Sequence, residues 1–266
     1  MPITALSGVA AVTLYLISLG LQGQAIKNRS ARITIQGNVL VFGLLAVAAH
    51  AVSAWTLISR ADGYHFGTFE VSTLIFAFIS FITILSSIRN PVGQLILGVF
   101  PCAALVIFLS LLTDSSYPPQ QLSAGLVAHV LLSILAYSLV TLAALQSLFL
   151  AFQNYQLRHQ RAATVIRRFP SLQDMEHLLF QLLWAAQILL SAAIVTGFLF
   201  VTDWGVQGLA HKMFFSILAW VVFAVLLWGR HQLGWRGNTA IRGTLIGFML
   251  LLLGFYGSKF VLEYIL

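Results

Sequence analysis

The sequence predicts an all-α fold, namely a polytopic membrane helix bundle of about eight transmembrane helices. Of its 266 residues, 59% are hydrophobic and only 8% are charged, whereas about a quarter of the residues are charged in ordinary soluble domains. Apolar stretches as long as the roughly 20 residues that cross a bilayer core follow one another along the chain. The few basic residues fall between these stretches. We therefore expect a single integral membrane domain over residues 1–266.

Apolar windows taken in order give eight candidate spans. They cover residues 3–22, 36–59, 69–88, 91–113, 123–153, 176–201, 211–229 and 240–263. The first window has no basic segment before it and no convincing cleavage site, so it is expected to be a retained helix and not a signal peptide. Pro91 is expected at the first turn of the fourth span, where proline is tolerated, whereas Pro101 lies inside that span and predicts a kink.

The distribution of basic residues predicts the sidedness of the loops, because basic residues in short loops collect on the cytoplasmic side. The odd-numbered connections carry eleven of them: Lys27, Arg29, Arg32, Arg89, Arg158, Arg161, Arg167, Arg168, Arg230, Arg236 and Arg242. The even-numbered connections and the C-terminus carry three, which are Arg60, Lys212 and Lys259. Both termini are therefore predicted on the outer side of the membrane.

Composition and motifs argue against several classes of function. The formal net charge of +7 is spread in small groups and forms no long basic face, so nucleic acid is not an expected partner. The single cysteine, Cys102, lies in an apolar run and allows neither an internal disulfide nor a cysteine-based metal site. The sequence has no HExxH motif, phosphate-binding glycine fingerprint, paired acidic cluster or GxSxG serine. It also shows no clear inverted repeat of the kind that secondary transporters carry. We do not expect an enzyme.

Four of the seven histidines fall in the outer half of this topology or above it: His50, His65, His129 and His211. Neutral imidazole is the commonest protein ligand for haem iron and many transition metals, and two histidines from different helices can clamp a haem axially. His129 and His211 form the natural pair, because both lie near the outer ends of spans that enter from the same side. Trp204 and Lys212 accompany them.

Each of these histidines also has a purely structural interpretation. A single histidine near a helix end can hydrogen-bond a neighbouring helix or water, and this stays open for His129 and His211. His50 lies within a span, where ionisable residues are rare and usually face the bundle interior. It is either a functional group or a neutral imidazole bonded to a backbone carbonyl or serine. His65 lies in the loop RADGYHFGTFE and is expected to be exposed to solvent.

Two basic segments are expected at the cytoplasmic membrane interface. In RRFPSLQDMEHLLFQ and in WGRHQLGWRGNTAIRG, arginines are placed to meet anionic lipid headgroups. Trp228 and Trp235 suit the interfacial aromatic belt. Neither segment requires a further ligand.

Four stretches carry a resemblance to a known family. They are GYHFGTFEVSTLIFAF, HVLLSILAYSLVTLAALQSLFLAFQ from His129, PSLQDMEHLLFQLL followed by TGFLF, and KMFFSILAWVVFAVLLWGRHQLGWRG. In this order they resemble the cytochrome c assembly protein family, that is, haem-handling membrane proteins of the CcsA and CcmC type, including shorter YpjD-type proteins. The resemblance implies a multi-pass protein of the bacterial inner membrane with its outer side facing the periplasm. It also implies that His129 corresponds to the first external haem-ligand histidine.

The chain departs from the family in the outer loop that cradles haem. In TDWGVQGLAHK, Trp204 and Lys212 fit the family pattern, but the further tryptophans and the Asp-Pro pair are missing. The family's second external histidine would be expected past Leu266. His211 stands where the family has a proline, and we hypothesise that it replaces the missing ligand in a bis-histidine haem site. His65 joins the candidate site through the early outer loop.

Two functions are therefore expected. The first is a haem-binding or haem-handling membrane protein related to cytochrome c assembly, with haem as cofactor or cargo. The alternative is a haem-free accessory or scaffold protein that supports a membrane-protein partner such as a metal-ion transport system. Both require the lipid bilayer as the protein's environment.

Overall fold

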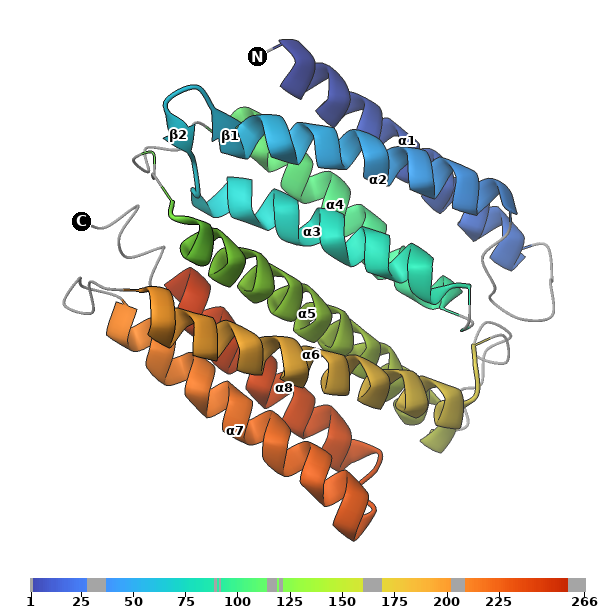
Figure 1. Ribbon diagram of the computed structural model, residues 1–266. Helices are drawn as coiled ribbons and strands as arrows, with labels where there is room; N and C mark the ends of the chain where they lie inside the picture. The colour runs from blue at the N-terminus through green and yellow to red at the C-terminus, as the bar shows by residue number, and fades with distance from the viewer. Residues whose placement is uncertain are drawn as a thin grey trace. The chain divides into compact units, whose positions relative to one another are not determined.

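The computed structural model describes residues 2–27, 37–88, 90, 92–113, 119, 122–159, 169–201 and 209–257. Within these ranges it contains eight helices that are long and apolar enough to cross a membrane (Figure 1). The predicted all-α, polytopic fold is confirmed. The side on which each terminus lies stays a prediction.

Seven helices follow the predicted spans to within five residues at each end, whereas α8 ends at Leu252, before the predicted end of the eighth span at residue 263. Their bounds are α1 Pro2–Lys27, α2 Gly37–Ile58, α3 Thr68–Ser86, α4 Gly93–Leu112, α5 Ala124–Arg158, α6 Leu172–Phe200, α7 Leu209–Leu233 and α8 Asn238–Leu252. A two-stranded hairpin, β1 Ser59–Arg60 and β2 Gly63–Tyr64, links α2 to α3, and a π-helical turn, η2 Leu253–Gly257, follows α8. Pro101 lies inside α4 as predicted, whereas Pro91 lies outside the described residues.

The end of α5 and the start of α6 extend beyond the predicted spans. Helix α5 continues to Arg158 and α6 begins at Leu172, both beyond the apolar windows. At the start of α6, the Ser171 hydroxyl accepts a hydrogen bond from the Asp174 N–H at 3.1 Å, which is N-terminal capping. The Asp174 carboxylate in the first turn also interacts favourably with the helix dipole. Polar residues therefore extend helices that hydropathy alone would end earlier.

The chain divides into two compact units. One comprises Met1–Gln120 with Phe152–Asp174, and the other comprises Gln121–Ala151 with Met175–Leu266. In the first unit, α1 packs on α2 and α4, and α3 packs on α2 and α4. Its core includes fully buried polar groups such as Tyr15 and His50 among the apolar side chains.

The second unit contains most of α5, most of α6, α7, α8 and η2. Polar side chains join its helices in pairs. The Gln146 side chain of α5 donates to the Met175 carbonyl of α6 at 3.0 Å. The Trp220 indole of α7 donates to the Ser191 hydroxyl of α6 at 2.8 Å. Such bonds between spanning helices add stability where hydrocarbon offers no alternative partner.

Candidate functional site

His129 lies in the second turn of α5, and its side chain forms a hydrogen bond with α6. Its Nδ1 donates to the Ala193 carbonyl at 2.9 Å, and the Thr196 hydroxyl lies 3.4 Å from the same nitrogen. The Thr196 hydroxyl in turn donates to backbone carbonyls one turn earlier in α6, at 2.8 and 3.0 Å. Its oxygen can therefore accept from the His129 ring.

A glycine on α6 makes room for this imidazole. A Cβ at position 197 would lie 3.0 Å from His129 Cε1 and 3.3 Å from Nδ1, which is closer than ordinary carbon contacts of about 3.5–4.0 Å. A second glycine brings the same two helices together nearby, since a Cβ at Gly125 would overlap the Phe200 ring. The pair Thr196-Gly197 belongs to the TGFLF stretch, and its role in seating His129 becomes visible in the structure.

This arrangement fixes the tautomer of His129. A carbonyl oxygen can only accept, so Nδ1 carries the proton and Nε2 carries a free lone pair. Nε2 makes no hydrogen bond among the described residues, and the side chain is partly exposed. Histidines that bind metals usually donate their other ring N–H to a carbonyl or carboxylate in this way.

The other predicted members of the outer site lie at the start of α7. His211 is the third residue of that helix, and its side chain is exposed. It makes no hydrogen bond with any described residue, and no contact joins it to His129 within the described ranges. Lys212 is half-buried and makes no ion pair there. Trp204 lies outside the described residues.

The π-helical turn η2 packs on the same end of α7. A Cβ at Gly254 would lie 2.9 Å from Phe215 Cβ and 3.6 Å from the Lys212 carbonyl oxygen. The rings of η2 also reach α5, where Phe255 lies 5.7 Å from Tyr137 between ring centroids. Single π-helical turns are frequent at functional sites. These contacts pack η2 against the first turns of α7, so the Lys212 backbone lies beside η2.

His65 belongs to the first unit, and the expectation that it is exposed is wrong. It follows the hairpin, with only 6% of its surface exposed. Its Nε2 lies 3.0 and 3.1 Å from the two carboxylate oxygens of Asp62, and its backbone N–H donates to the Ile58 carbonyl. The hydrogen bond from the His65 ring lowers the pKa of the Asp62 carboxyl. The tight hairpin folds the ring inward, which a loop assignment from hydropathy cannot foresee.

His50 is fully buried in the first unit. Its Nδ1 lies 3.1 Å from the Tyr15 hydroxyl of α1, and the two rings meet edge to face. The sequence predicts a backbone carbonyl or a serine as its structural partner. The ring bonds the Tyr15 hydroxyl, from 35 residues earlier in the chain, and also interacts with the backbone of Thr73 on α3. His50 Nε2 is buried without a hydrogen bond among the described residues.

The turn between α7 and α8, GWRG in sequence, has a structural explanation. Gly234 and Gly237 adopt positive φ angles of 65° and 54°, which favour glycine. The Glu176 carboxylate of α6 accepts from the Gly237 N–H at 2.7 Å. Arg230 donates to the Trp235 carbonyl at 3.2 Å and stacks over the Phe180 ring at 4.7 Å.

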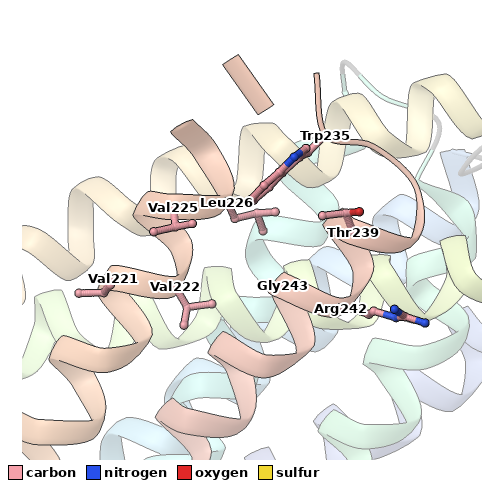
Figure 2. Close-up of a pocket in the computed structure, with 8 residues that line it drawn as sticks. All are labelled: Val221, Val222, Val225, Leu226, Trp235, Thr239, Arg242 and Gly243. Carbon is pink, nitrogen blue, oxygen red and sulfur yellow. The ribbon is translucent and has the colours of Figure 1, made fainter. Parts of the chain in front are cut away.

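A groove lies beside this turn, between α7 and α8 (Figure 2). It has a volume of about 380 Å³. The sequence predicts interfacial anchors here, and the groove becomes visible in the structure.

Fold and site together define a polytopic helical membrane protein with a histidine whose orientation is fixed near the end of a spanning helix. The chain belongs to the Cytochrome C assembly protein family, whose model matches residues 38–266. This confirms the resemblance seen in the sequence. The protein is a multi-pass protein of the bacterial inner membrane.

Three relatives illustrate the breadth of the match. Inner membrane protein YpjD of Escherichia coli strain K12 is 27% identical over 270 residues, which cover 100% of each chain. An uncharacterised 28.8 kDa protein of Azospirillum brasilense is 28% identical over 254 residues, covering 92% of this chain and 90% of its own. Protein HemX of Brevibacillus brevis is 23% identical over 210 residues, covering 77% of this chain and 69% of its own. No solved structure matches the chain.

Proposed function

We propose that this protein binds or handles haem at the outer face of the inner membrane, with His129 Nε2 as an axial ligand of the iron. The observation that carries the proposal is the bond from His129 Nδ1 to the Ala193 carbonyl at 2.9 Å. It leaves Nε2 as the nitrogen with a free lone pair, as an iron ligand requires. Membership of the cytochrome c assembly family supports haem over other metal ligands.

His211 is the proposed second ligand. It lies in the first turn of α7 with an exposed ring, so its imidazole is accessible to a bound group. Lys212, the next residue, is half-buried and has no ion pair with any described residue. A cation in that setting suits a haem propionate, because a partly buried charge gains from a counter-ion. On the family resemblance, Trp204 would also belong to this site.

Haem would supply a redox-active iron or would itself be the transported cargo. The chain's own residues would bind and orient it: two imidazoles on the iron and an ammonium at the propionates. We infer no bond-forming chemistry of the protein's own, because the proposed residues are ligands and counter-ions.

The absorption spectrum of the purified protein tests this proposal. Wild-type protein from haem-replete cells should show a low-spin bis-histidine Soret band. His129→Ala and His211→Ala should each lose the six-coordinate low-spin signature, and the double variant should lose bound haem. His159→Ala is a matched control, because this exposed ring at the other end of α5 hydrogen-bonds, among the described residues, to its own helix. A double variant that keeps the wild-type spectrum would refute the ligand assignment.

A haem-free accessory or scaffold function is the second candidate. It is favoured by one observation: His211, unlike His129, has no hydrogen bond among the described residues that orients its ring. Metal-binding histidines are usually held by such a bond. A colourless wild-type preparation that co-purifies with another membrane protein would support this function.

A further inference from the structure

The groove between α7 and α8 combines an apolar wall with a positive charge that no described residue compensates. Its apolar wall is formed on α7 by Val221, Val222, Val225 and Leu226. Val221 and Val225 are 43% and 47% exposed, so their side chains are available to a ligand. Leu226 is almost fully buried and forms the base of the groove.

The groove exists because the two helices approach closely at glycines. A Cβ at Gly243 of α8 would lie 3.0 Å from a methyl group of Leu226, and one at Gly247 would overlap the Phe223 ring. Small residues allow spanning helices to come together in this way. The short valine side chains beside the crossing leave the remaining space unfilled, and Trp235 closes the end nearest the turn by lying on Gly229.

The positive charge lies at the edge of the groove. Figure 2 shows the guanidinium of Arg242 on α8 directed away from the α7 valines. Arg242 is exposed and makes no hydrogen bond or ion pair with any described residue. Two other charged residues near the turn already have partners. Arg230 of α7 donates to the Trp235 carbonyl, and Glu176 of α6 accepts from the Gly237 N–H. Within the described part of the chain, the Arg242 guanidinium therefore stays available to an external anion.

Thr239 lies one turn before Arg242 on the same helix and also lines the groove. Its side chain is exposed, and its hydroxyl makes no hydrogen bond among the described residues. A hydroxyl and a guanidinium at the rim can both donate to phosphate oxygens. The apolar wall on the opposite side offers nothing to an inorganic ion, so the groove suits an amphipathic anion.

We propose that this groove binds an anionic glycerophospholipid of the cytoplasmic leaflet, with its phosphate at Arg242 and Thr239 and an acyl chain along the valines of α7. The surrounding bilayer supplies such a ligand in the orientation that the groove requires. The predicted topology has this turn on the cytoplasmic side, where anionic headgroups and basic residues meet. This site is separate from the proposed haem site at the other end of α7.

The experiment measures which phospholipid remains on the purified full-length protein. Protein is exchanged into nanodiscs of equal parts phosphatidylglycerol and phosphatidylethanolamine, extracted with detergent, and its retained lipids are counted by native mass spectrometry. Wild-type protein should retain phosphatidylglycerol in preference to phosphatidylethanolamine. Arg242→Gln should reduce that preference about fivefold, the usual effect of one basic residue at an anionic surface, whereas Arg242→Lys should keep most of it.

Two further variants locate the site. Val225→Trp fills the groove without changing charge, and it should also lower phosphatidylglycerol retention. Arg158→Gln is the matched control, because Arg158 is an exposed arginine in the last turn of α5 and does not line the groove. The Arg158→Gln variant should retain as much phosphatidylglycerol as the wild-type protein. Size-exclusion profiles and helical circular dichroism confirm that each variant is folded.

Three results would overturn the proposal. The first is equal retention of the two lipids by wild-type protein. The second is an Arg158→Gln effect as large as that of Arg242→Gln, which would indicate a general surface charge effect. The third is loss of haem with unchanged phospholipid in Arg242→Gln and Val225→Trp, which would assign the groove to haem.

Discussion

Replacing Gly197 with alanine should weaken haem binding while leaving the fold intact. The new Cβ would lie 3.0 Å from His129 Cε1, so the ring must move by roughly half an ångström to reach an ordinary carbon contact. That movement would lengthen the 2.9 Å bond from Nδ1 to the Ala193 carbonyl toward or beyond the usual limit of about 3.2 Å. The imidazole would then lose the contact that orients Nε2.

The magnitude follows from these contacts. Loss of a bond that orients a metal-ligating histidine usually costs about 10- to 100-fold in affinity. The lost helix-to-helix hydrogen bond would cost about 1 kcal/mol of stability. The exchange of glycine for alanine inside a helix would return about 1 kcal/mol. The free energy of unfolding should therefore change little, whereas haem affinity should fall about 10- to 100-fold.

Haem titration followed by absorbance measures the affinity, and thermal unfolding of the apoprotein measures the stability. Gly20→Ala is the matched control, because a Cβ at this helical glycine of α1 meets no neighbouring atom within 4 Å. That variant should gain about 1 kcal/mol of stability with unchanged haem affinity. If Gly197→Ala binds haem as tightly as the wild type, the orienting role of α6 is refuted.

Three other substitutions test separate contacts. Tyr15→Phe removes the 3.1 Å hydrogen bond between the Tyr15 hydroxyl and the His50 ring and should lower the free energy of unfolding by about 1–3 kcal/mol, because a buried polar group loses its side-chain partner. Trp220→Phe removes the 2.8 Å bond to Ser191 and should cost about 1 kcal/mol by the same unfolding assay. Asp62→Asn should lower the unfolding midpoint more at pH 6 than at pH 3. The hairpin histidine lowers the pKa of this carboxyl, so its stabilising effect is fully present above the usual aspartate pKa of about 4 and is lost as the pH falls through the lowered pKa.

Matched controls distinguish these effects from loss of bulk or of an aromatic ring. Trp228→Phe changes a tryptophan of the same helix that is 58% exposed, and it should leave stability nearly unchanged. Tyr155→Phe removes the hydroxyl of a tyrosine that is 52% exposed, and it should also leave stability nearly unchanged. An equal loss in the control and in its buried counterpart would contradict the proposed hydrogen-bond contributions. Equal destabilisation by Asp62→Asn at both pH values would contradict the hairpin ion pair.

The spanning helices could be predicted from sequence because each is encoded locally by a run of apolar residues. The ends of α5 and α6 could not, since Ser171 and the polar residues around it extend helices without raising hydropathy. His65 shows the same limit: its burial depends on how the hairpin folds it onto Asp62.

The candidate site was predictable only in part. His129 stood out because a polar residue near the outer end of an apolar span is unusual. Its partners Thr196 and Gly197 could not be assigned, because they lie 67 and 68 residues further along the chain and have no chemistry that marks them as a site. Tyr15 was missed for the same reason, although it is a polar aromatic residue inside an apolar helix and thus carried a weak signal. Pairs on different helices become visible only when the helices are packed.

The account depends most on His129 being an iron ligand, and rescue by imidazole tests this directly. His129→Gly should remove the ligand while leaving space for a small molecule, so the purified variant should lose the low-spin haem spectrum. Added imidazole should restore that spectrum in a saturable manner. A His129→Gly variant with the wild-type spectrum, or one whose altered spectrum does not respond to imidazole, would contradict the central claim.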